Sequence, residues 1–261
     1  MLDPRGKIIR MSRFRPLLLA LLLAAPLACK PPFDPKIYTS ADKLYQAAMA
    51  EYKAGHYDNA VKAFEKLTLD LPARDPRLPL AFYYLAQSHS KNGEELLAAA
   101  TYNRLIDAFP QDTLVDDALF LSGRAYEREW RHPELDATYG RSAITAYESL
   151  LASYPDSPYA KRAQDELARL DEWLAEKDYN TGYLYLKRKA FDSAILYFKD
   201  VIQKHPNARK AKDAYLRLLE SYKAIRYTED ARDLCGAMRK AYANDRDVLK
   251  ACGPAPSTPA T

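Results

Sequence analysis

The sequence predicts an all-α protein, an α-solenoid of about five repeated helix pairs in which one long helix links the third and fourth pairs. Three observations support this fold class. Glycine is scarce, with 8 copies in 261 residues, whereas alanine, leucine, lysine, glutamate and tyrosine are abundant. Four stretches of the chain follow one template that ends in proline. The intervals between these stretches differ by lengths that correspond to whole helical turns or to a loop.

The four stretches share an alanine, an aromatic residue, an aliphatic residue and a final proline. They are AVKAFEKLTLDLP (60–72), AAATYNRLIDAFP (98–110), AITAYESLLASYP (143–155) and AILYFKDVIQKHP (194–206). The aromatic residue lies 4 positions after the alanine, the aliphatic residue 7 and a bulky residue 11. These offsets fall on one face of an α-helix, and proline cannot continue a helix. The template therefore predicts four amphipathic second helices. A fifth, looser copy begins at Ala231 without a proline, as expected of a terminal repeat.

The intervals between repeats predict two irregular connections. The repeats start 38, 45, 51 and 37 residues apart. The 14 additional residues of the third interval make close to four helical turns, so we expect one unbroken helix from about Tyr159 to Lys187, with Gly182 as its weakest point. The second interval has eight additional residues, which predict an extended loop within EREWRHPELDATY (127–139). Trp130 and Pro133 make this loop a candidate contact surface.

The N-terminus predicts a lipoprotein signal peptide over residues 1–28. Five basic residues precede a run of twelve apolar residues that is too short to cross a bilayer. Leu27 and Ala28 stand directly before Cys29, an arrangement that resembles the lipobox of bacterial lipoproteins and implies lipidation of Cys29. The alternative is an ordinary signal peptide in which Cys29 is incidental. Residues 29–39 then form a stiff proline-rich tether, and Met11 is a second candidate start.

Charge and motif content argue against nucleic-acid binding and catalysis. The net charge is +4, but residues 1–28 hold five basic residues and one acidic residue, so the remainder carries 34 of each sign. The four histidines are dispersed without metal-ligand spacing, and no glycine-rich phosphate loop or nucleophile motif is present. We therefore expect no catalytic residues, no metal site, no cofactor and no nucleic-acid partner. His205, at a repeat position otherwise held by Leu, Phe or Tyr, is expected to be structural.

The repeat positions carry a family resemblance. The spacing of Gly55, Tyr57, Ala60, Phe64 and Pro72 resembles the tetratricopeptide repeat, a unit of two antiparallel helices. Five such repeats behind a lipidated cysteine, with a long connection between the third and fourth, resemble the BamD family of lipoproteins in the outer-membrane β-barrel assembly machinery.

This resemblance implies a location on the outer membrane, lipid-anchored and facing the periplasm. It also implies partners: the barrel-forming subunit, which docks on the C-terminal repeats, other lipoprotein subunits, and unfolded outer-membrane barrel proteins. Tyr197 occupies a position where many relatives carry arginine. Tyr197 and Trp130 are the expected docking residues. The alternative is a different periplasm-facing repeat lipoprotein that serves envelope maintenance, secretion or motility.

The first helices of the first two repeats are expected to line a peptide-binding groove. On the tetratricopeptide pattern, the groove positions are Tyr45, Met49, Tyr52, Lys53, Tyr83, Gln87 and Lys91. Tyrosine suits such a surface because it offers a large ring and a hydroxyl, and the chain has 20 of them. The alternative is that these tyrosines pack between repeats.

Two further cysteines lie near the C-terminus, 17 residues apart. In an oxidising compartment, Cys235 and Cys252 could form a disulfide, and the alternative is one buried and one loose thiol. We expect the repeat domain to span residues 40–250 and a disordered tail to span residues 251–261, which are rich in proline and alanine.

Overall fold

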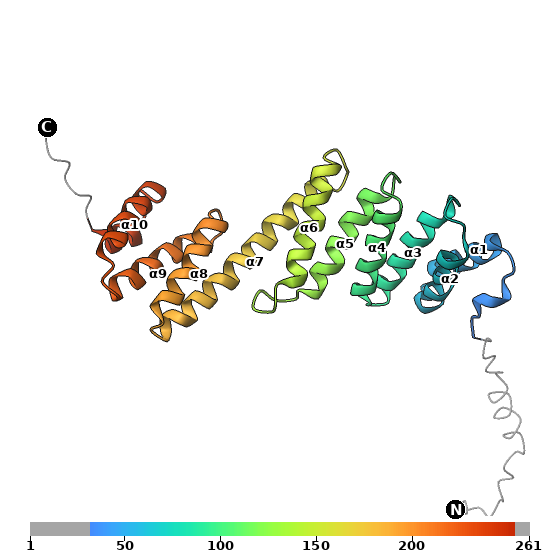
Figure 1. The fold of residues 1–261 in the computed structure, drawn as a ribbon, viewed down its shortest axis with the longest axis horizontal. Coiled ribbons are helices and arrows are strands. Elements are labelled where there is room, and N and C mark those ends of the chain that lie inside the picture. Colours follow the sequence, from blue (N-terminus) through green and yellow to red (C-terminus); the bar gives the residue numbers. More distant parts are fainter. Residues whose placement is uncertain (1–31, 254–261) are drawn as a thin grey trace, which may run out of the picture. The chain divides into compact units, whose positions relative to one another are not determined.

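The computed structural model describes residues 32–253, and the chain divides into two compact units, residues 1–37 and 38–261. The described part of the first unit contains a short 3-10 helix, η1 (Pro35–Ile37), within the predicted tether. The predicted signal peptide and Cys29 lie outside the described residues. In the second unit, the described residues form α-helices joined by turns and loops and contain no strand, which confirms the predicted fold class (Figure 1).

The helices follow one another in antiparallel pairs. Their bounds are α1 (Ala41–Lys53), α2 (Tyr57–Asp70), α3 (Arg77–Lys91), α4 (Glu95–Ala108), α5 (Val115–Glu129), α6 (Thr138–Ser153), α7 (Ala160–Lys187), α8 (Phe191–Lys204), α9 (Lys210–Ala224), α10 (Thr228–Ala241) and α11 (Arg246–Cys252). Each helix packs against the next one in the chain, and first helices also contact across repeats, as α1 with α3 and α7 with α9. Each of the predicted second helices ends two residues before its template proline.

The template residues form the core of the stack. The alanine, aromatic and aliphatic positions of α2, α4, α6 and α8 are all buried, with exposures of 0–2%. In α2 these residues are Ala60, Phe64 and Leu67. Burying one such large side chain stabilises the fold by about 1.5–3 kcal/mol. The repeated template therefore supplies a continuous apolar seam between neighbouring helices.

The turn inside a repeat requires a left-handed backbone conformation. Gly55 (φ +79°) and Gly93 (φ +81°) end the turns after α1 and α3, five residues before the template alanine. In the fourth and fifth repeats the same position is held by Lys189 (φ 59°) and Arg226 (φ 62°). Glycine adopts this conformation without steric penalty. The turn geometry is thus kept even where the glycine is absent.

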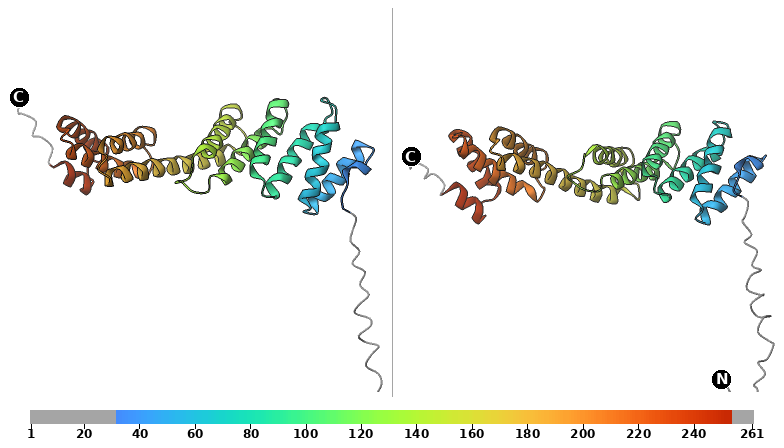
Figure 2. Two further views of the ribbon diagram at one scale, coloured as in Figure 1. Left: turned by 60° about the horizontal axis from the view of Figure 1, so that its bottom comes forward. Right: turned by 90° about the horizontal axis from the view of Figure 1, so that it is seen from below.

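The long helix is present as predicted. It is α7, 28 residues without interruption, which corresponds to about 42 Å. Its first part packs on α6 and its second part on α8 and α9, as the views in Figure 2 also show. Gly182 does not interrupt it. A Cβ atom at Gly182 would lie 3.0 Å from a ring carbon of Phe198, so the glycine permits close contact between α7 and α8.

The predicted loop of the third repeat joins α5 to α6, but its role as a contact surface is wrong for Trp130 and Pro133, which are both buried. Trp130 is 1% exposed and its ring lies edge-on to that of Trp173 on α7, with 5.4 Å between centroids. Lys177 on α7 donates to the backbone carbonyl oxygen of Leu135 at 2.8 Å. The loop is therefore folded onto α7, and its tryptophan belongs to the core.

The last helix extends further than expected, whereas residues 254–261 of the predicted tail lie outside the described residues. Residues 251 and 252, assigned above to the tail, complete α11. Asp245 caps this helix by accepting from the backbone N–H of Asp247 at 2.9 Å, and Lys212 on α9 binds the Asp245 carboxylate at 2.9 Å. Cys235 on α10 and Cys252 on α11 are joined by a disulfide bond. This short helix thus covers the last repeat.

Candidate binding surface on the first helices

The predicted groove residues lie on two neighbouring helices, α1 and α3. Lys53 and Lys91 are exposed, whereas the others are partly buried: Tyr45, Met49, Tyr52, Tyr83 and Gln87. Contacts between α1 and α3 bring the two sets together across the repeat boundary. The predicted residues therefore share one surface, and their role in binding stays a prediction.

Tyrosine rings make part of this surface rigid. The Tyr52 ring packs edge-on against Tyr84, with 5.3 Å between centroids, and its hydroxyl donates to the Gln87 side-chain oxygen on α3. The Tyr83 ring lies 6.2 Å from that of Tyr102 on α4. The Tyr52 ring thus packs between repeats, as the alternative interpretation held, and the Tyr83 ring packs within its own repeat, while both tyrosines retain partly exposed surface. The two interpretations are compatible for the same side chains.

The tyrosine hydroxyls remain protonated donors at neutral pH. Burial raises the pKa of Tyr52 above its usual value, and burial together with the nearby Asp117 carboxylate raises the pKa of Tyr83. A hydrogen bond to Asp117 raises the pKa of Tyr159 to about 12. Tyr83 on α3 and Tyr159 at the start of α7 therefore both face Asp117 on α5, which ties three successive repeats together.

We expect Tyr52→Phe to lower the free energy of unfolding by about 1 kcal/mol, because the Gln87 oxygen loses its donor in a partly buried position. The measurement is urea unfolding followed by circular dichroism. Tyr57→Phe is the matched control, since the Tyr57 hydroxyl has no hydrogen bond within residues 32–253. Equal losses in the two variants would show that the bond to Gln87 contributes nothing.

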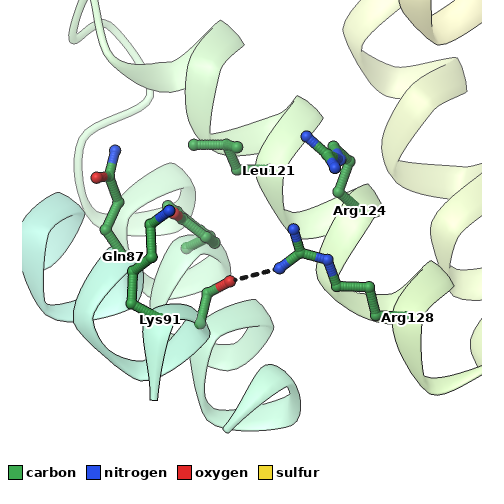
Figure 3. A pocket seen from close by; sticks show the side chains of 7 residues that line it. Gln87, Lys91, Leu121, Arg124 and Arg128 are labelled. Atoms are coloured by element: carbon green, nitrogen blue, oxygen red, sulfur yellow. Dashed lines mark hydrogen bonds between the residues drawn. The ribbon is translucent and has the colours of Figure 1, made fainter. Parts of the chain in front are cut away.

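A hollow of about 400 Å³ extends this surface from α3 onto α5. Gln87 and Lys91 line one side of it and Leu121, Arg124 and Arg128 the other, as Figure 3 shows. Tyr102 and Ser90 complete the lining.

Sequence reasoning did not include the α5 residues of this hollow. A repeat signal was nevertheless available, because the buried Ala81 and Ala118 lie 37 residues apart on α3 and α5. The same step carries Gln87 to Arg124 and Lys91 to Arg128.

The hollow is positively charged. Arg128 is held in place, since its guanidinium donates to the Ser90 hydroxyl at 2.8 Å and to a Glu95 carboxylate oxygen at 2.7 Å. Lys91 and Arg124 have no ion-pair partner among residues 32–253. Two unpaired cations beside the Gln87 amide can bind carboxylate or backbone carbonyl oxygens of a polypeptide. The arrangement suits the binding of such groups.

The two predicted docking residues differ in their exposure to solvent. Tyr197 on α8 is partly buried and stacks on Tyr185 of α7, with 5.6 Å between ring centroids. Trp130 is enclosed by the core and offers no docking surface. His205 is also buried, and its Nδ1 lies 2.5 Å from a carboxylate oxygen of Asp171 on α7. His205 therefore has the structural position that was expected of it.

Two other properties bear on the site. Across residues 32–253, no helix combines the length and apolar character needed to span a membrane. Within the same residues, no three His, Cys, Asp or Glu side chains gather in a way that would hold a metal ion.

Together, the paired helices and the cationic hollow define a helical-repeat protein with a positively charged surface on its first helices. The chain belongs to the YfiO family, described as outer membrane lipoprotein, which matches residues 38–235. A Vibrio cholerae protein named outer membrane protein assembly factor BamD is 28% identical over 228 residues, covering 81% of this chain and 91% of that protein. A Neisseria gonorrhoeae protein of the same name is 27% identical over 210 residues, covering 74% and 76%.

Solved structures that match this chain include tetratricopeptide proteins. The P58(IPK) TPR domain has a TM-score of 0.44 at 12% identity, covering 81% of this chain and 54% of that one. The TPR2AB domain of yeast Sti1 has a TM-score of 0.40 at 17% identity, covering 81% of each chain.

Proposed function

We propose that this chain is an outer-membrane-anchored lipoprotein scaffold that assists the assembly of outer-membrane β-barrel proteins. Its N-terminal groove, formed by α1, α3 and α5, binds segments of unfolded barrel proteins. The C-terminal repeats bind the barrel-forming subunit, with Tyr197 in the contact, and other lipoprotein subunits join the complex. The role is that of a scaffold and not of an enzyme.

One structural observation supports the proposal: the charge of the hollow between α3 and α5. The cationic hollow carries Lys91 and Arg124, which have no ion-pair partner within residues 32–253, next to a fixed Arg128 and to Gln87, which is bound by the partly buried Tyr52. Such a surface offers hydrogen-bond donors and ring area to a chain whose own backbone groups are not yet paired. Membership in the YfiO family and the names of the relatives support the class of substrate.

The proposed anchor is the lipidated Cys29, which holds the repeats at the periplasmic side of the outer membrane. Stable anchoring takes more than one acyl chain, at about 0.8 kcal/mol for each buried methylene. The tether of residues 29–39 sets the distance between the lipid and the first repeat. This placement keeps the groove close to the bilayer into which its substrates insert.

We expect the double variant Lys91→Glu/Arg124→Glu to bind a urea-denatured barrel protein at least about tenfold more weakly, because two charge-assisted contacts become repulsive. Fluorescence anisotropy of a labelled barrel protein diluted into the full lipidated chain in detergent measures this affinity.

The matched control is Lys62→Glu/Lys240→Glu, which makes the same charge change at exposed positions on α2 and α10. An equal loss in both double variants would attribute binding to net charge. Unchanged affinity in Lys91→Glu/Arg124→Glu would contradict the role of the hollow.

A further inference from the structure

A second hollow, of about 290 Å³, lies among α8, α9 and α10. Its floor is apolar: Leu218 and Tyr222 of α9 are 2% and 4% exposed, and Ile202 of α8 and Leu234 of α10 are partly buried against them. This volume lies at the lower end for ligand pockets and accommodates one or two side chains, not a large cofactor. No residue of the N-terminal groove takes part in it.

One rim of this hollow is acidic and unpaired. Asp230 and Asp233 of α10 are exposed and have no ion-pair or hydrogen-bond partner within residues 32–253. Their spacing of three residues places both on one helix face, where like charges destabilise a helix slightly. Asp230 lies in the first turn of α10, where the helix dipole favours it, but Asp233 lies beyond that turn. A cation bound at this rim would relieve the repulsion.

The opposite rim carries one cation and continues as apolar surface. The Lys199 ammonium of α8 lies 5.7 Å from the centroid of the Tyr222 ring, so this cation is engaged within the protein. Leu196, one turn before Lys199 on the same helix, is 60% exposed. The surface therefore offers an apolar slot with two carboxylates at its rim, and the helix that carries Lys199 also exposes a leucine.

We propose that this slot is a docking site for an amphipathic segment of a partner polypeptide. The segment inserts an aliphatic or aromatic side chain between α8 and α10 and places lysine or arginine against Asp230 and Asp233. The charge of the rim selects this occupant. The chain's own residues 254–261, PAPSTPAT, contain no basic residue and do not match it. The inference rests on the proposed docking of a partner on the C-terminal repeats and specifies the chemistry of one contact there. It holds whether or not the N-terminal hollow binds barrel proteins.

The test places a photocrosslinking phenylalanine at Ala237, an exposed residue lining the slot, in the full chain produced in its own host. The expected result is a crosslink to a segment of another polypeptide that combines aliphatic or aromatic residues with lysine or arginine. Asp230→Asn/Asp233→Asn should reduce the crosslink by about three- to tenfold, because it removes two ion pairs and keeps the side-chain shape.

The control variant Asp156→Asn/Asp192→Asn removes two exposed acidic residues that do not line the slot and should leave the crosslink intact. Several outcomes would overturn the proposal. These are a crosslink to residues 254–261 or to a second copy of the chain, an equal reduction in the control variant, or no crosslink at all. Circular dichroism of both variants verifies that they fold equally well.

Discussion

Replacing Trp130 by alanine is expected to lower the free energy of unfolding by about 3–5 kcal/mol, the largest loss from any single substitution discussed for this chain. The indole is 1% exposed and lies between the start of α6 and Trp173 of α7. Its removal leaves a cavity where the third repeat meets the long helix. Urea unfolding of the variant against the parent chain measures the loss.

A substitution at Gly140, which lies against the Trp130 ring, tests whether the lost packing of that ring causes the destabilisation. A Cβ atom at Gly140 would lie 2.0 Å from a ring carbon of Trp130, so Gly140→Ala alone should destabilise by about 1–3 kcal/mol. In the Trp130→Ala background the added methyl group meets empty space, and the same substitution should cost nothing. The double-mutant cycle therefore predicts strong coupling between the two positions.

Leu135→Ala is the control for this pair. Leu135 lies in the same loop but is 51% exposed, so its truncation should change stability by less than about 0.5 kcal/mol. Comparable losses from Trp130→Ala and Leu135→Ala would mean that the loop, and not the buried ring, determines the effect. Additive losses in the cycle would refute the direct contact.

Reducing the Cys235–Cys252 disulfide is expected to destabilise the C-terminal repeat by about 3 kcal/mol, the value for a closed loop of similar length. The bond holds α11, which has 7 residues and is too short to be stable as an isolated helix. Without the bond, Val248 of α11 is less firmly held against Met238 of α10 and Leu219 of α9, which are otherwise buried.

Hydrogen exchange with and without a thiol reductant measures this effect, and faster exchange should be confined to α10 and α11. The control is Cys235→Ala/Cys252→Ala, which should exchange like the reduced chain and show no response to reductant. Identical exchange of the oxidised and reduced parent chain would contradict the proposed stabilisation. So would an effect of reductant on the double variant.

Helix positions were predictable because they depend on local chemistry. Proline cannot extend a helix, so Pro72 and its equivalents set the ends of the second helices, and the template spacing defines their buried faces. The additional residues between the third and fourth repeats make close to whole helical turns, so they keep the apolar residues on one face. They therefore predict α7 as a single helix. The α5 side of the cationic hollow was not predicted, although the same periodicity could have identified it, by the step that carries Lys91 to Arg128.

The loop of the third repeat shows where such reasoning ends. A tryptophan in a proline-containing segment suggests an exposed contact, because loops usually run over the surface. Its burial depends on Gly140, ten residues away, and on Trp173, which the long helix brings alongside. The helix α11 was missed for a related reason, since its stability comes from a disulfide and from contacts with α9 and α10.

The amino-acid sequence by itself determined the helices of the repeats, their order and the face that each one buries, because these follow from interactions between residues close together in the chain. Only the tertiary structure decided which side chains remain for partners. Burial of Trp130, the free state of Lys91 and Arg124, and the acidic slot beside α10 depend on which distant helices come into contact, and local periodicity carries no information about those contacts.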